Sequence, residues 1–432
     1  MRQSILKRIL AGLFLAFLLL PIFTPITAEA APDKPVVVVI DPGHGGKSNG
    51  AEYFDKKEKD INLTVAKSIK KNLEYFEGVK VYLTRTDDQD FSYKIRSNYA
   101  KTKKADYFIS VHFNESAEHN QTGCEIYVQS KKDLNKKIMP IAQSVMNFMG
   151  DYGIHEGGIY TCTNAEDKDY FGILESATTD KIPAMIVEHF YMDREEYLPY
   201  FETKEALEEL GRQDALAVAR ALKLDVATLY YGYRDMDDVE FSDPTPLKEG
   251  YVHPESAVLS VKEYEQITNR SAICTIQLRA TDPKGEIAFY RLSKDGGKTF
   301  GEDTEFENAG TSEFTMTMRV GENIEFAALA FNKDHLCVRS NNLNVFDEIE
   351  LDPEFSKHKM EEQLAKEAEE KARLEAEEAA KAEREALESK DGDVNDHNPS
   401  LTDTQKVVVV FGAIFGIAMA IFLLIFRNKE RG

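Results

Sequence analysis

Basic residues are too few in this chain of 432 residues to balance the acidic ones. Lysine and arginine together number 53, against 75 aspartates and glutamates, and the formal net charge is -22 at pH 7. A protein that binds nucleic acid needs a basic face to neutralise phosphates. The composition therefore argues against nucleic acid as a partner.

Cysteine is also scarce, with two residues in each of the two regions that we expect to fold: Cys124, Cys162, Cys274 and Cys337. Two interpretations are open. In an exported protein, Cys124 can pair with Cys162, and Cys274 with Cys337, as disulfides. The four residues can equally be free, buried thiols.

Long apolar runs without charge occur at the two ends of the chain. Lys7 and Arg8 precede an apolar run at 9–20, and small residues follow near residue 30, which predicts a secretory signal peptide over residues 1–30. If this segment stays uncleaved, it becomes a second anchor.

Residues 407–426 carry no charge and are numerous enough to span a bilayer as a transmembrane helix. The basic stub at 427–432 predicts a cytoplasmic C-terminus. We therefore expect a single-pass protein of the cell membrane, with everything between the two end segments outside the cell. Gly412 and Gly416 form a GxxxG pair that can seat a helix dimer.

Three apolar, strand-like runs each end in a side chain suited to metal binding or proton transfer: His44, His112 and Glu188. In an open α/β sheet, the carboxyl ends of the strands gather along one edge, where ligands bind. Glu58 begins a segment with helical spacing. Two imidazoles and one carboxylate are a ligand set that holds catalytic zinc with an open fourth position. We therefore predict a zinc site with Glu188 free to move protons.

Strand-like and helix-like segments alternate over residues 35–225. This alternation predicts an α/β catalytic domain with a mostly parallel, twisted sheet flanked by helices. The expected strands lie at 36–40, 79–85, 106–113, 125–129 and 184–188, and the expected helices at 58–76, 135–149 and 204–222.

Beyond residue 226 the pattern changes to short runs that alternate apolar and polar residues, which predicts a small β-sandwich-like domain over 240–348. Residues 293–300 resemble an Asp-box hairpin, but a single copy cannot build a propeller. We find no cluster of titratable residues to which chemistry can be assigned there. The expected role of this domain is spacing or binding.

Residues 356–390 consist almost entirely of Glu, Ala, Lys, Arg and Leu, with Glu-to-Lys pairs at i,i+4 spacing. The apolar positions do not hold a heptad seam, so we predict a single, charged helical spacer rather than a coiled coil. Residues 391–405 contain Gly, Asn, Pro and Ser, and read as a flexible linker.

Four motifs follow one another along the chain: DPGHGG, EKDINL, ADYFISVHFN and PAMIVEHFYMD. Their sequences and their order resemble those of the zinc-dependent N-acetylmuramoyl-L-alanine amidases of the amidase_3 type. These enzymes cut the bond between muramic acid and the stem peptide of peptidoglycan. The resemblance covers roughly residues 35–225. It implies one Zn²⁺ per catalytic domain, held by His44, Glu58 and His112, with Glu188 as the catalytic base.

The chain departs from the family pattern at 153–180, which bears on substrate fit, and at His189, which follows Glu188. All four site residues also have rival interpretations. His44 can simply orient the glycine-rich turn, His112 can face solvent at the end of a strand, and Glu188 can be half of an ion pair. Glu58 can be the N3 residue of a capping box that begins at Asp55. His189 can compete with Glu188 for the active-site role.

Two other functions are open. A non-catalytic peptidoglycan-binding membrane receptor would suit the same architecture. A zinc peptidase of other specificity is a second alternative, although the chain lacks the HExxH helix of the commonest form. Tethering favours restricted wall remodelling close to the membrane, under an unidentified regulator.

Overall fold

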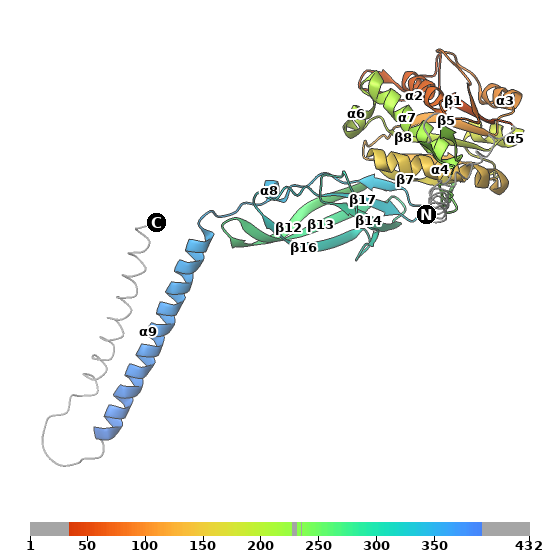
Figure 1. Cartoon of the computed structure of the whole chain (residues 1–432). Helices are drawn as coiled ribbons and strands as arrows, with labels where there is room; N and C mark the ends of the chain where they lie inside the picture. Colours follow the sequence, from red (N-terminus) through yellow and green to blue (C-terminus); the bar gives the residue numbers. More distant parts are fainter. Residues whose placement is uncertain (1–33, 227–230, 235, 391–432) are drawn as a thin grey trace, which may run out of the picture. The chain divides into compact units, whose positions relative to one another are not determined.

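The computed structural model describes residues 34–226, 231–234 and 236–390 (Figure 1). The chain divides into two compact units, the first ending at Pro353 and the second beginning at Glu354. Within these ranges, no helix has both the length and the apolar composition that crossing a membrane requires. Several predicted segments lie outside the described residues: the signal peptide (1–30), the flexible linker (391–405), the transmembrane helix (407–426) and the stub (427–432).

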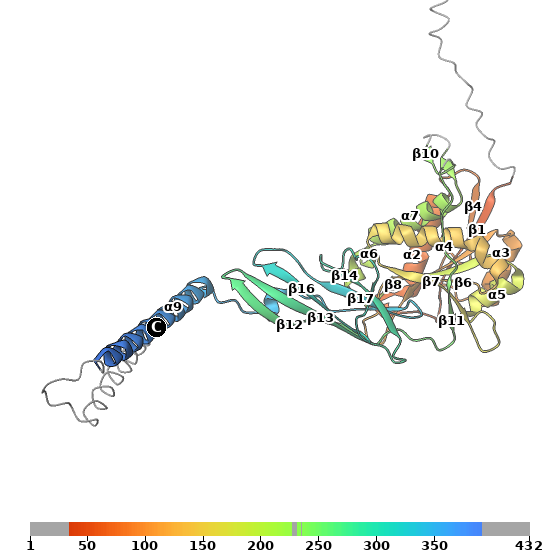
Figure 2. The ribbon, with the colours of Figure 1, turned by 90° about the horizontal axis from the view of Figure 1, so that it is seen from below.

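A seven-stranded sheet in the first unit has the order β11-β7-β6-β8-β5-β1-β4. All neighbouring pairs are parallel except β6 and β8. Helices such as α4 (Lys132–Tyr152) and α5 (Gly172–Asp180) lie beside this sheet (Figure 2). The strands are β1 (Val36–Pro42), β4 (Val79–Leu83), β5 (Tyr107–Asn114), β6 (Cys124–Val128), β7 (Glu156–Thr163), β8 (Ala184–Tyr191) and β11 (Thr245–Lys248). The predicted α/β domain with a mostly parallel sheet is confirmed.

Helices cover both faces of this sheet. Along β1, Val38 and Ile40 belong to one apolar core and Val39 to another, because successive side chains of a strand point to opposite faces. The first core includes residues of α2 (Glu58–Leu73), α4 (Lys132–Tyr152) and α7 (Lys204–Ala221). The second includes residues of α3 (Tyr93–Lys103) and α5 (Gly172–Asp180). The continuous apolar run of β1 is thus explained by burial on both sides.

Short elements connect these layers. They are β2 (Glu52–Tyr53), β3 (Lys56–Lys57), η1 (Glu195–Tyr197), α6 (Leu198–Phe201), β9 (Asp225–Val226) and β10 (Tyr231–Gly232).

Two antiparallel sheets that share one apolar core follow the central sheet in sequence. One contains β12 (Ser256–Thr268), β13 (Ser271–Thr281) and β16 (Thr311–Arg319). The other contains β14 (Ile287–Ser293), β15 (Thr304–Glu305), β17 (Ala327–Asn332) and β18 (Cys337–Arg339), and α8 (Val345–Glu348) follows. One strand departs from the expected division of the chain: β11 lies within 240–348, yet it extends the central sheet. The domain boundaries themselves stay a prediction.

The second unit is described here by α9 (Phe355–Lys390), a single helix of 36 residues. Its side chains are exposed from Ser356 to Glu385. Ion pairs at i,i+4 spacing, such as Glu362 with Lys366, support it.

All four cysteines are free and buried. Of the two interpretations of the cysteine pattern, the structure therefore supports free thiols and not the disulfide pairs Cys124–Cys162 and Cys274–Cys337. The packing explains this, because the two members of each expected pair lie in different apolar clusters as small hydrophobic side chains: Cys124 and Cys162 in one pair, Cys274 and Cys337 in the other.

Candidate metal centre and active site

His44, Glu58 and His112 come together at the carboxyl edge of the central sheet. Nε2 of His44 lies 3.0 Å from Oε2 of Glu58, and Nδ1 of His112 lies 2.9 Å from Oε1 of the same carboxylate. Their donor atoms all lie within 4.8 Å of one another. Ligands of one tetrahedral zinc ion stand roughly 3 to 4 Å apart, so this donor set fits the metal that the sequence predicts.

The loop after β1 shapes this cluster. His44 has a φ of 57°, and its Nδ1 lies 2.8 Å from Oγ of Ser48, which orients the ring so that Nε2 faces Glu58. A fixed partner on the second ring nitrogen is typical of metal-binding histidines. Gly50 has a φ of 70°, and a Cβ there would lie 2.1 Å from Oε2 of Glu58. The glycine thus leaves the space that the carboxylate fills.

Two buried arginines hold the same loop by its carbonyl oxygens. Arg85 donates to the carbonyls of Pro42 and Gly43 at 2.9 and 2.8 Å. Arg96 donates to the carbonyls of Pro42 and His44 at 2.8 and 2.7 Å, and pairs with Asp41 at 2.9 Å. The sequence alone assigns no role to Arg85 or Asp41. Arg85 acts through the backbone carbonyls of this loop and Asp41 through its ion pair with Arg96, and only the fold brings these groups together.

Glu58 does not act as a capping residue. It is the first residue of α2, and its carboxylate accepts hydrogen bonds from the backbone amides of Ala51 and Phe113 at 3.0 and 3.1 Å. Burial alone would raise the pKa of this carboxyl, but the two imidazoles outweigh burial and lower the pKa below its ordinary value. The capping-box interpretation is therefore wrong, and Glu58 stays ionised as a metal ligand must.

Glu188 lies on β8 directly opposite His112 of β5. One of its carboxylate oxygens, Oε2, is buried and has no hydrogen-bond partner within the described residues. Burial, together with the nearby negative charges of Glu58 and Glu125, raises the pKa of Glu188 well above its ordinary value. A carboxyl group with a raised pKa takes up a proton more readily than an ordinary carboxyl group, as transfer of a proton from water requires.

His189 points away from this cluster. It is fully buried, its Nε2 lies 2.8 Å from Oδ2 of Asp214 on α7, and its Nδ1 lies 3.0 Å from the carbonyl of His112. A β-bulge in β8 follows Glu188, since His112 pairs with Glu188 but Asn114 pairs with Tyr191. Bulges re-aim side chains beside active sites. The rival interpretation, in which His189 is the active-site group, does not fit, because the His189 ring is buried and both of its nitrogens already have partners.

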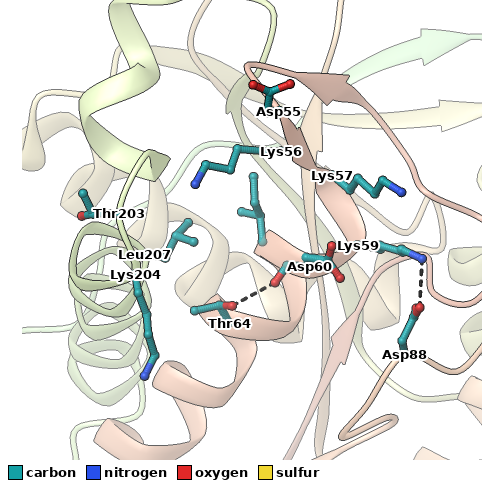
Figure 3. Close-up of a pocket in the computed structure, with 11 residues that line it drawn as sticks. Asp55, Lys56, Lys57, Lys59, Asp60, Thr64, Asp88, Thr203, Lys204 and Leu207 are labelled. Carbon is teal, nitrogen blue, oxygen red and sulfur yellow. Dashed lines mark hydrogen bonds and ion pairs between the residues drawn. The ribbon is translucent and has the colours of Figure 1, made fainter.

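Two cavities lie near the cluster. The larger, about 540 Å³, lies between the starts of α2 and α7 and is lined by lysines and aspartates, with Lys59 paired to Asp88 at 2.9 Å (Figure 3). None of the metal-binding candidates lines it. The smaller, about 300 Å³, is lined by His44 and His112 together with aromatic side chains from the start of α3. Size alone therefore does not identify the active site, and the smaller cavity is the one that reaches the donor set.

Comparison with known proteins agrees with this geometry. Residues 38–220 match the family model of the N-acetylmuramoyl-L-alanine amidases. The amidase AmiC of Escherichia coli O6:H1 is 29% identical over 138 residues, which are 31% of this chain and 33% of that protein. The sporulation-specific amidase of Bacillus subtilis strain 168 is 39% identical over 94 residues, which are 22% of this chain and 36% of that protein. The chain thus spans only about a third of the length of these curated relatives.

Among solved structures, an N-acetylmuramoyl-L-alanine amidase from Clostridium difficile 630 is 27% identical, with a TM-score of 0.39, over 44% of this chain and 97% of that one. The family model covers all four residues of the predicted site, and the motifs that suggested the family lie within it. Residues 38–220 therefore match the N-acetylmuramoyl-L-alanine amidase family, and the predicted site lies within this match.

Proposed function

We propose that this protein hydrolyses the amide bond between N-acetylmuramic acid and L-alanine in peptidoglycan, with one zinc ion held by His44, Glu58 and His112. The observation that carries the proposal is the complete donor set, with its atoms within 4.8 Å, inside the amidase-family segment. A non-catalytic receptor of the same fold would be expected to have lost a ligand.

An amide is a poor electrophile, and zinc, when bound, supplies a Lewis acid that polarises the carbonyl and lowers the pKa of a water molecule. The side chains of the protein would transfer the proton and hold the His44 loop in place. Glu188, with its unpartnered Oε2, would take the proton of the attacking water and deliver it to the departing alanine nitrogen. Arg85 and Arg96 would keep the His44 loop in place through its carbonyls.

Where the protein works is part of the same proposal. The patterns of residues 1–30 and 407–426 support export and a single membrane anchor, with the site on the cell-wall side. At 1.5 Å per residue, α9 would supply a spacer of roughly 50 Å. Such a tether favours cutting wall close to the cell's own membrane. An unidentified regulator and a dimer through Gly412 and Gly416 stay predictions.

The test is zinc content together with the release of stem peptides from purified peptidoglycan, with and without a chelator. We expect about one zinc per chain and chelator-sensitive release of peptides that carry a free L-alanine amine. Zinc binding with intact wall would instead support the peptidoglycan-binding receptor. Cleavage of a protein substrate in place of the wall would support the peptidase.

A further inference from the structure

A segment outside the amidase-family match reaches the back of the active site. β11 pairs in parallel with β7, from Thr245 opposite Tyr160 to Lys248 opposite Thr163. A turn follows, in which the amide of Tyr251 donates to the carbonyl of Lys248 at 3.0 Å. The sheet thus fixes a stretch of chain that carries Tyr251 and His253 and that begins well after residue 220, where the family model ends.

Both side chains contact a buried network around Glu125. Glu125 lies on β6, only 1% exposed, and directly opposite Glu188 of β8. Directly opposite residues of an antiparallel pair present their side chains on the same face of the sheet. The carboxylate of Glu125 therefore shares a face with Glu188, and its position bears on that of the proposed base.

Protein donors surround the Glu125 carboxylate. Its hydrogen-bond donors are the hydroxyls of Tyr127 at 2.8 Å and Tyr191 at 3.1 Å and the side-chain amide of Asn114 at 3.3 Å. A buried carboxylate needs such partners, because a buried charge without hydrogen bonds strongly destabilises the fold. The position of Glu125 therefore depends on how firmly these donors are held.

Tyr251 holds one of these donors. Its hydroxyl lies 2.9 Å from the hydroxyl of Tyr127. A tyrosine hydroxyl has one proton. Since Tyr127 donates that proton to Glu125, the hydroxyl of Tyr251 must donate to Tyr127. The result is a chain of hydrogen bonds from Tyr251 through Tyr127 to Glu125, in which each bond polarises the next.

His253 approaches the other oxygen of the same carboxylate. Its Nε2 lies 3.6 Å from Oε1 of Glu125, and its Nδ1 lies 3.3 Å from the backbone carbonyl of Cys337. A carbonyl only accepts, so Nδ1 carries a proton, and this bond orients the ring with Nε2 toward Glu125. The imidazole thus stands between β18 and the Glu125 carboxylate.

We propose that Tyr251 and His253 are positioning residues for Glu188 and act on it through Glu125. Glu188 has an oxygen without a hydrogen-bond partner within the described residues, so the groups beside it fix where its carboxylate lies. The chain beyond the family segment then serves as part of the active site and not only as a spacing or binding module. This inference rests on the proposed amidase function.

The test compares three variants of the full, zinc-loaded chain. Tyr251→Phe removes one hydroxyl and keeps the ring, and His253→Ala removes the imidazole. Tyr264→Phe is the matched control, because Tyr264 is exposed on β12 and its hydroxyl donates to the carbonyl of Glu350. The measurements are kcat and KM for peptide release, bound zinc, and hydrogen exchange of the β6 and β8 backbone amides.

We expect Tyr251→Phe and His253→Ala to lower kcat roughly 10- to 100-fold, as a displacement of about 1 Å does. KM and bound zinc should stay unchanged, and exchange on β6 and β8 should rise. Tyr264→Phe should match the unsubstituted chain. An unchanged kcat in both site variants, or a loss of zinc that accounts for the decrease, would overturn the positioning role.

The two levels of the proposal can fail separately. If the unsubstituted zinc-loaded chain releases no peptide, the proposed function is wrong. Hydrogen exchange still decides whether Tyr251 and His253 hold the pair of β6 and β8. Unchanged exchange in both variants would then also overturn the structural part of the inference.

Discussion

Gly43 lies so close to His112 that a Cβ atom at residue 43 would stand 2.2 Å from Cε1 of the imidazole. Real Cβ atoms do not approach other atoms so closely, so a side chain at this position would displace the ring. Gly43 directly follows β1 and His112 lies on β5, and these two strands are hydrogen-bonded neighbours. Glycine at residue 43 is therefore a condition for the metal-binding position of His112.

Gly43→Ala should consequently weaken zinc binding, roughly 10- to 100-fold, by displacing one ligand while leaving all three in the chain. Competition with a chelator of known affinity measures the effect. Gly301→Ala is the control, since a Cβ there makes an ordinary contact of 3.5 Å. Equal zinc affinity of the Gly43→Ala and Gly301→Ala variants would show that His112 does not need this space.

Removing any one ligand should release the metal. His44→Ala, Glu58→Ala and His112→Ala each leave two of the three protein donors, and we expect bound zinc to fall from about one per chain to near zero. His119→Ala removes an exposed histidine that pairs with Asp193 and should keep its zinc. Metal analysis after dialysis gives the result. Full zinc in any of the three ligand variants would remove that residue from the site.

Glu188 should behave differently from the ligands. Glu188→Gln keeps the size of the side chain but cannot accept the proton of water, so kcat should fall roughly 10²- to 10⁴-fold with zinc retained. Glu156→Gln on β7 changes an exposed carboxylate and should leave kcat near that of the unsubstituted chain. Normal turnover by the Glu188→Gln variant would mean that another group is the base.

Sequence reasoning succeeded where a residue's role follows from its place in a periodic pattern. Val36 to Ile40 and the run that ends in His112 are strands whose carboxyl ends meet, so the convergence of His44 and His112 was predictable from the fold class alone. Glu58 was predictable as the start of a helix, although its freedom from a capping role was not. The carboxylate of Glu58 does not cap the helix because it accepts hydrogen bonds from the backbone amides of Ala51 and Phe113 instead.

The rest depends on contacts between segments far apart in the chain. The sequence around Glu125 predicts only a buried strand. The antiparallel pairing of β6 with β8, which the sequence does not predict, places Glu125 opposite Glu188. Tyr251 and His253 lie in a loop without periodicity, so no local signal connects them to residues more than a hundred positions earlier. The short strand β11 was likewise hidden, because a strand of 4 residues carries too little alternation to be recognised.

The buried thiols give a prediction about oxidation state. Because Cys124, Cys162, Cys274 and Cys337 are free and buried, a thiol reagent should label them slowly in the folded protein and rapidly after unfolding in denaturant. A reductant should leave Tm unchanged. Mass spectrometry after labelling without reductant counts the free thiols. A mass lower by two hydrogens per pair and resistant to labelling would reveal a disulfide and contradict the structure.

His155 should make the stability of the protein depend on pH. Its half-buried ring packs against Phe300 and Phe331. Loss of contact with water there, with the positive charges of Arg291 and Arg339, lowers its pKa from 6.5 to about 3. In the unfolded chain the imidazole binds a proton near pH 6.5, so between that pH and about 3 the unfolded state holds more protons than the folded one. The contribution of His155 is therefore complete above pH 6.5 and is lost progressively as the pH falls.

The expected loss is about 1.4 kcal/mol of unfolding free energy per pH unit within this window. His155→Leu places an apolar side chain against Phe300 and Phe331 that cannot bind a proton. The unfolding free energy of this variant should therefore change less steeply between pH 6.5 and 4. Urea denaturation of the unsubstituted protein and the variant at several pH values gives the difference in slope, which cancels the contribution of other groups. Parallel curves for the two proteins would show that His155 does not resist protonation in the fold.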